Sequence, residues 1–131
     1  MVAMIQNQSG AAQEYLDQAA AFIAEKGMQN YIPLLELTQG QLRRRQDDPR
    51  QALEHLDRAV ALAESNDLRP ILWQAHAEAA LALRALSQAP AADERLRQAQ
   101  AVIAEIAGLF KNESYRQVFL ANTTRQLELA E

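Results

Sequence analysis

The sequence predicts an all-α protein of stacked antiparallel helices, and composition is the first observation behind this prediction. Ala, Leu, Gln, Glu and Arg dominate the 131 residues, whereas there are only four glycines and four prolines. The common residue types lose little rotamer freedom in a helix, so the chain as a whole favours helix. Apolar residues recur at spacings of three and four, which is the second observation and is typical of helices with one buried face.

The third observation is a segment that recurs at a spacing of 40 residues. The four-residue segments that begin at Leu16, Leu56 and Leu96 align with one another. The positions after them also correspond, first as Ala21, Ala61 and Ala101 and then as Phe22, Leu62 and Val102. Self-similarity at such a period is typical of a repeat array, in which each unit buries its apolar face against the next.

Two helices are expected in the first third of the chain. The first should extend from Ala11 to Lys26, because Gly27 can adopt the left-handed conformation that ends a helix. The second should extend from Tyr31 to Arg45, with Asn30 as its cap. Pro33 fits its first turn, where a missing amide hydrogen costs nothing.

Three further helices are expected before residue 109. Asp48 followed by Pro49 predicts the start of the third, with Gln51 three residues after the cap. Asp67 should cap a fourth helix from Leu68 to Leu86, with Pro70 near its start. The fifth should begin near Pro90 and end at Gly108. Since the connections are short, consecutive helices should be antiparallel neighbours.

Residues 109–131 do not follow the repeat. Asn112 can cap a short helix through Leu120, and Asn122 can cap another to the end of the chain. Terminal units of repeat arrays are atypical because they must present a polar outer face. We therefore expect a single domain over 1–131, with repeat helices over 11–108 and a capping segment over 109–131.

The small and large residues of the third and fifth helices resemble those of the tetratricopeptide repeat (TPR) family. In that family the second helix of each pair has an alanine near its start, a large residue four later and an alanine three further on, as in Ala52-Leu56-Ala59 and Ala92-Leu96-Ala99. Gly40 and one of Ala79 or Ala80 match the small residue of the first helix. The resemblance implies a TPR-like α-α superhelix that binds proteins rather than catalysing a reaction.

The stretch from Leu68 to Asn122 is similar to the last repeats of long bacterial signalling and transcriptional regulators, which implies a regulatory or scaffold role. By repeat phase, the first expected helix is the second member of a pair whose partner is missing. We therefore expect a fragment of a longer array. The alternative is a small stand-alone protein that covers its open edge by homo-oligomerisation through its unpaired terminal helix.

Several functional classes find no support in the sequence. The net charge of −4 disfavours nucleic acid as a partner, because phosphate binding needs a concentrated positive face. Cysteine is absent, and the two histidines, His55 and His76, are not at zinc-ligand spacing. No phosphate-binding glycine loop, membrane-length apolar run or signal peptide is recognisable. We expect no enzyme activity, cofactor, metal or membrane contact, and a cytoplasmic location.

The candidate binding surface is the inner face of the superhelix. The run Arg43-Arg44-Arg45 either complements the negative end of a helix dipole or presents Arg44 to acidic groups of a partner. Trp73, the only tryptophan, either packs between helices or serves as an exposed anchor, and Tyr31 is open to the same two interpretations. The expected groove for a protein or peptide consists of Leu34, Leu37, Gln41, Arg44, Trp73, Gln74, Ala77 and Arg84.

Overall fold

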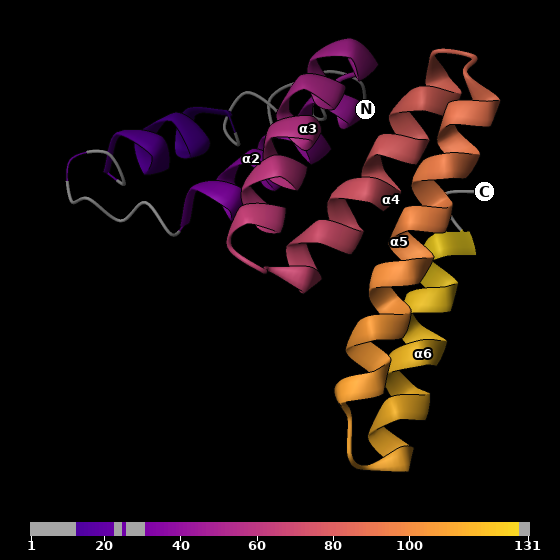
Figure 1. Cartoon of the computed structure of the whole chain (residues 1–131). Helices are drawn as coiled ribbons and strands as arrows, with labels where there is room; N and C mark the ends of the chain where they lie inside the picture. Colours follow the sequence, from indigo (N-terminus) through magenta and orange to yellow (C-terminus); the bar gives the residue numbers. More distant parts are fainter. Residues whose placement is uncertain (1–12, 23–24, 26–30, 129–131) are drawn as a thin grey trace, which may run out of the picture.

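The computed structural model describes residues 13–22, 25 and 31–128, and this part of the chain is helical without any strand. Residues 13–22 form the N-terminal helix. The others are α2 (Ile32–Arg45), α3 (Pro49–Ser65), α4 (Arg69–Ala85), α5 (Ala89–Leu109) and α6 (Glu113–Glu128) (Figure 1). The all-α fold class is therefore confirmed. The expected helix stop at Gly27 and the expected cap at Asn30 lie outside the described residues.

Three turns of the same geometry connect α2, α3, α4 and α5. Each contains one residue with positive φ, namely Asp47 at 62°, Asp67 at 55° and Ser87 at 61°. In each, the next amide donates back across the turn to the preceding helix, as in the 2.9 Å bond from the Asp48 N–H to the Arg43 carbonyl. This is the Schellman arrangement that ends helices, and it reverses the chain within a few residues. Consecutive helices are consequently antiparallel (Figure 1).

Two of the expected helix caps are confirmed. The Asp48 carboxylate accepts a 3.2 Å hydrogen bond from the Gln51 N–H at the start of α3. The Asn112 side chain accepts a 3.1 Å bond from the Tyr115 N–H at the start of α6. In both, a side-chain oxygen satisfies an amide that has no partner within its own helix.

Three other boundary predictions are wrong. Asp67 does not cap α4, because it is the left-handed residue that ends α3, and Leu68 takes the cap position without a side-chain bond. Gly108 lies inside α5, which ends one residue later. Asn122 lies inside α6, so the C-terminal segment forms one continuous helix instead of two short ones.

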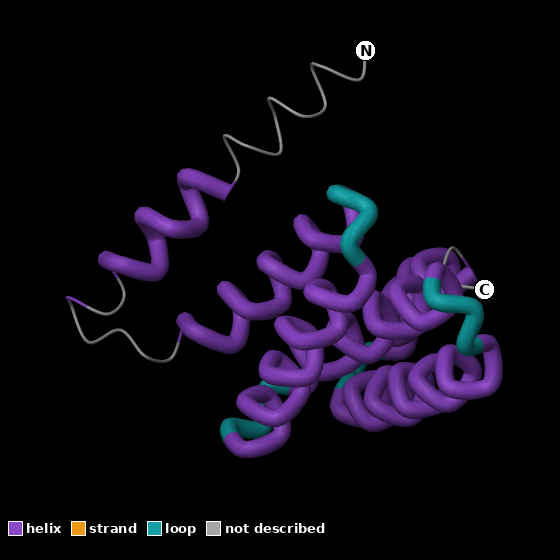
Figure 2. Tube along the Cα trace, turned by 90° about the horizontal axis from the view of Figure 1, so that it is seen from above, coloured by secondary structure: helices purple, strands orange, loops and turns teal. Residues whose placement is uncertain are grey.

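The helices pack in chain order around two apolar clusters. One joins α2, α3 and α4 and includes Leu37, Leu56 and Ala79. The other joins α4, α5 and α6 and includes Ala80, Leu96 and Leu127. In addition, α2 contacts α4, whereas α6 packs against α5. The N-terminal helix thus lies at one end of the stack and α5 with α6 at the other (Figure 2).

The alanines that carry the family resemblance are buried at equivalent places in α3 and α5. Ala52 and Ala59 in α3, like Ala92 and Ala99 in α5, have no exposed surface. Small side chains at these points let neighbouring helices approach closely. Gly40 shows the same effect on α2, because a methyl group there would lie 2.5 Å from the Leu56 side chain.

Candidate functional site

A polar groove lies between α2 and α4. Its volume is about 410 Å³. Five of the eight residues expected from the sequence line it, namely Gln41, Arg44, Trp73, Gln74 and Ala77. The structure adds four residues that sequence reasoning did not select, namely Arg45, Glu78, Leu81 and Gln126.

The groove combines charged groups with amides. The Arg44 Nε donates a 2.6 Å hydrogen bond to the Glu78 carboxylate across the groove. The Arg45 side chain is exposed and makes no hydrogen bond or ion pair within the described part of the chain. Two guanidinium groups against one carboxylate give the lining a net charge of +1, in a protein whose net charge is −4. The groove therefore favours an anionic group in an otherwise acidic molecule.

Three glutamines supply neutral polar groups to the same groove. Gln41 comes from α2, Gln74 from α4 and Gln126 from α6. The Gln74 amide nitrogen already donates 2.8 Å to the Pro70 carbonyl. A glutamine side chain offers both donors and an acceptor, which are the groups that a peptide backbone requires.

Trp73 packs between helices, which was the first of its two interpretations. It is 6% exposed and belongs to the cluster that joins α4, α5 and α6. The ring only borders the groove, so it is not a protruding anchor. Tyr31, by contrast, is about half exposed, and it lines a different cavity beside the N-terminal helix.

The remaining three expected groove residues lie elsewhere. Leu37 is buried in the core cluster with Leu56 and cannot reach the groove. Leu34 lines the same second cavity as Tyr31. The Arg84 guanidinium donates a 2.9 Å hydrogen bond to Asp93 at the α4–α5 turn.

Three of the four additional groove residues have a signal in the local sequence, and the fourth has none. Arg45 belongs to the conspicuous arginine run, and the carboxylate of Glu78 lies one helical turn from Gln74 on the same face of α4. Leu81 continues that face. Gln126 had no local signal, because only the packing of α6 brings it to the groove.

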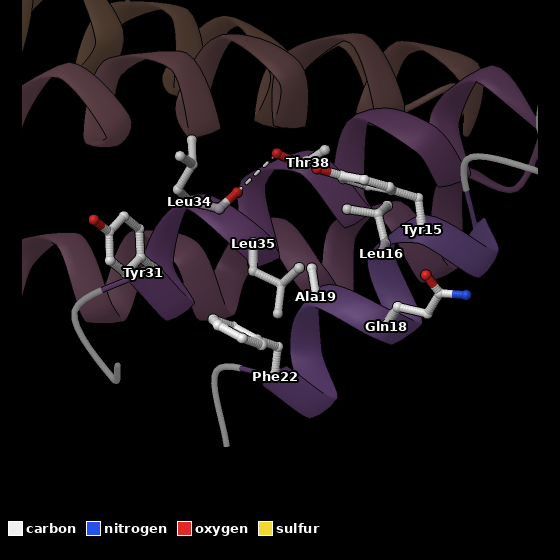
Figure 3. A pocket seen from close by; sticks show the side chains of 9 residues that line it. All are labelled: Tyr15, Leu16, Gln18, Ala19, Phe22, Tyr31, Leu34, Leu35 and Thr38. Carbon is white, nitrogen blue, oxygen red and sulfur yellow. Dashed lines mark hydrogen bonds between the residues drawn. The ribbon is translucent and has the colours of Figure 1, made fainter. Parts of the chain in front are cut away.

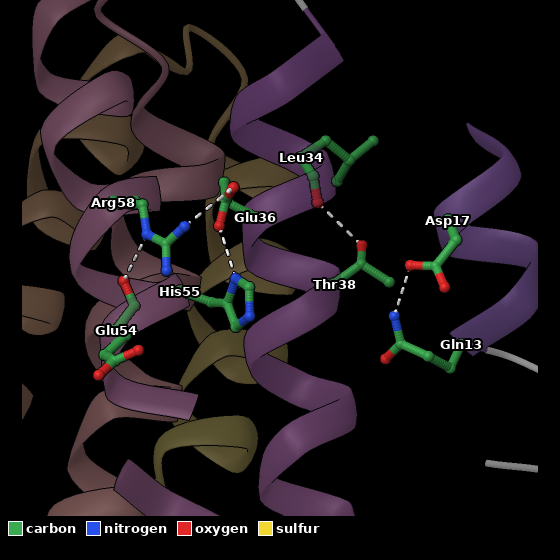
Figure 4. Close-up of polar contacts among 8 residues, drawn as sticks. All are labelled: Gln13, Asp17, Leu34, Glu36, Thr38, Glu54, His55 and Arg58. Carbon is green, nitrogen blue, oxygen red and sulfur yellow. Dashed lines mark hydrogen bonds and ion pairs between the residues drawn. The ribbon is translucent and has the colours of Figure 1, made fainter. Parts of the chain in front are cut away.

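The two histidines take part in contacts between helices. His55 Nδ1 lies 2.8 Å from the Glu36 carboxylate of α2, and the His55 side chain is only partly exposed (Figure 4). His76 of α4 is buried, and its Nδ1 lies 3.2 Å from Arg95 of α5. Arg95 also pairs with Asp57 of α3. These contacts join neighbouring helices.

The surroundings of His76 favour its neutral form. Burial, and next the neighbouring Arg95 guanidinium, lower the pKa of His76 to about 4, although the Asp57 carboxylate acts in the opposite direction. A neutral imidazole can accept the Arg95 hydrogen bond at Nδ1. The histidine therefore serves as an acceptor within a polar contact that joins three helices.

The described residues contain no group of three or more His, Asp and Glu side chains placed to hold a metal ion. None of their helices is long and apolar enough to span a bilayer. No family model, curated protein or solved structure matches the chain. The assignment to the TPR family thus stays a prediction.

Proposed function

We propose that this chain is a non-catalytic protein-interaction module whose polar groove binds an acidic segment of a partner protein. The observation that carries the proposal is the groove between α2 and α4, in which the Arg44–Glu78 pair lies beside Arg45, an arginine without an ion-pair partner among the described residues. A carboxylate of a partner could pair with Arg45 without displacing Glu78. Charge-assisted hydrogen bonds of this kind are about twice as strong as neutral ones.

The size and rigidity of the groove fit a short peptide segment. A volume of about 410 Å³ lies within the ~300–1,000 Å³ range of ligand sites, and it accommodates a few side chains but not a whole domain. The walls belong to helices with packed cores, so the site is formed before the partner arrives. Preformation reduces the conformational entropy that binding has to overcome.

We also propose that the helices form a TPR-like superhelix in which α6 is the C-terminal capping helix. The identical turns after α2, α3 and α4, and the buried alanines of α3 and α5, support this arrangement. The sequence resemblance of Leu68–Asn122 to the last repeats of bacterial regulators is the basis on which we propose a regulatory or scaffold role in the cytoplasm.

Selection from a displayed library of random peptides would test the proposed function. We expect enrichment of peptides with Asp or Glu, and Arg45→Gln should weaken the selected peptides by about tenfold, which corresponds to ~1.4 kcal/mol. Arg50→Gln is the matched control, because Arg50 is an exposed arginine outside the groove. Enrichment of basic or purely apolar peptides, or equal effects of the two substitutions, would contradict the proposal.

A further inference from the structure

The N-terminal helix and α2 enclose a second, apolar groove. Its volume is about 620 Å³, and its walls come from both helices (Figure 3). Phe22 of the N-terminal helix and Leu35 of α2 point toward one another across it (Figure 3). The lining consists of Tyr15, Leu16, Gln18, Ala19, Phe22, Tyr31, Leu34, Leu35 and Thr38, none of which is charged.

Large apolar side chains remain exposed around this groove. Tyr15 is 73% exposed, Phe22 52% and Leu34 50%. Between residues 35 and 108, a stretch that the structure describes completely, no large hydrophobic residue is exposed to this degree. The pattern of burial in α3 and α4 is therefore not repeated at the N-terminal end, where no helix of the described residues covers the groove.

We propose that a second copy of this chain covers the apolar groove, so that two chains associate through their N-terminal helices and α2. This inference is independent of the proposed peptide groove, which lies between α2 and α4. The chain supplies both partners of such a contact, since exposed aromatic side chains border an apolar hollow. A two-fold arrangement would place the aromatic side chains of each copy in the groove of the other.

The exposed apolar area is sufficient for a small dimer interface. An aromatic side chain presents ~150–250 Å² when uncovered, so the exposed parts of Tyr15, Phe22 and Tyr31 amount to about 350 Å² per chain, and the half-exposed Leu34 adds to this area. Two copies would bury about twice this area as an apolar centre. With a polar rim around it, the interface reaches the ~1,200 Å² at the lower end of stable complexes.

Charge also favours a second copy as the occupant. Each chain carries a net charge of −4, so most pairs of surfaces would bring like charges together. The lining of this groove is uncharged and avoids that cost. The acidic side chain of Asp17 does not line the groove, and it accepts a 2.8 Å hydrogen bond from Gln13 one turn earlier (Figure 4).

The test is the absolute mass of the full chain by light scattering across a hundredfold range of concentration. We expect the mass to rise from 14.6 kDa toward twice that value. Leu34→Glu should raise the dissociation constant of the dimer by about tenfold or more, because it places an unpaired charge in the interface. Tyr15→Glu, which changes the opposite wall of the apolar groove, should also raise the dissociation constant of the dimer.

Val118→Glu is the matched control, since Val118 is 59% exposed on α6 and lies far along the chain from the groove. It should leave the dissociation constant unchanged. Helicity by circular dichroism checks that each variant is folded. A monomer at every concentration, or a dimer weakened by Val118→Glu but not by Leu34→Glu and Tyr15→Glu, would overturn the inference. Binding of acidic peptides should survive Leu34→Glu, so failure here is distinguishable from failure of the proposed function.

Discussion

The α2–α3 pair and the α4–α5 pair make their central polar contact with different residues at equivalent positions. In the first pair, Glu36 of α2 contacts His55 of α3 at 2.8 Å. The residues 40 positions later are His76 of α4 and Arg95 of α5, which contact each other at 3.2 Å. In the first pair a histidine of the second helix thus contacts a carboxylate. In the second pair a histidine of the first helix contacts a guanidinium group.

The apolar contacts of the two pairs are far more alike. Leu56 and Leu96 are both buried. Leu56 shares an apolar cluster with small residues of α4, the helix after its own, and Leu96 shares one with a small residue of α4, the helix before its own. The comparison teaches that burial at fixed positions maintains the helix packing, whereas the polar contact across each pair can be built in more than one way. It also predicts that equivalent apolar substitutions have similar costs in the two pairs.

The largest expected effect is the removal of these leucine side chains. Leu56→Ala and Leu96→Ala should each reduce the free energy of unfolding by ~2–5 kcal/mol, because each leaves a cavity in a packed core. If the pairs are equivalent, the two losses should agree to within about 1 kcal/mol, measured by urea denaturation. A loss near zero for either variant would show that its pair is not packed as described.

The second prediction concerns the effect of pH on stability, which should distinguish the His76–Arg95 contact from the Glu36–His55 contact. The pKa of His76 is about 4 in the folded protein, whereas it is near 6.5 in an unfolded chain. Between these values the unfolded state binds a proton that the folded state does not. The contribution of His76 is therefore fully present above pH 6.5 and declines as pH falls, by about 3 kcal/mol once pH 4 is reached.

Urea denaturation at neutral pH and near pH 4.5 measures this effect. Between these two pH values, the free energy of unfolding of His76→Gln should fall by about 2 kcal/mol less than that of the unsubstituted protein, since glutamine does not titrate. The same substitution at the equivalent interface, His55→Gln, should retain the acid sensitivity that His76 causes. Equal acid sensitivity of His76→Gln and the unsubstituted protein would contradict this account of His76.

The smallest effect is expected at two glycines in helix interiors. Gly40→Ala should lower stability by about 1 kcal/mol, because overpacking against Leu56 exceeds the gain in helix propensity. Gly108→Ala should raise stability by about 0.5 kcal/mol, since among the described residues no atom beyond the neighbouring backbone of α5 lies within 4 Å of its new methyl group. Thermal unfolding of both variants gives the comparison. Stabilisation by Gly40→Ala would show that α2 and α3 are less closely packed.

The sequence predicts the helices and most of the core because these depend on local patterns. Three- and four-residue apolar spacing locates α3, α4 and α5, and Asp48 marks the start of α3 through its own capping bond. Asp67 misleads because an aspartate can adopt the left-handed backbone conformation that ends a helix as well as cap the start of one. Nothing local distinguishes these two roles.

The candidate groove is only partly predictable for a different physical reason. Residues of α2 and α4 share a face by helical periodicity, so Gln41, Arg44 and Gln74 could be selected from sequence. Gln126 enters the groove through the packing of α6, which spacing within one helix does not encode. The prediction for Leu37 is wrong because helical periodicity does not separate a core face from an adjacent groove face.

The most direct test of the central claim, that the polar groove binds acidic segments, is the fluorescence of Trp73. It is the only tryptophan of the chain and borders this groove, so its emission reports on occupancy. Titration with an acidic peptide should give a saturable change, whereas the same peptide with Asn and Gln in place of Asp and Glu should give none. Equal responses to both peptides, or no response to either, would contradict the claim.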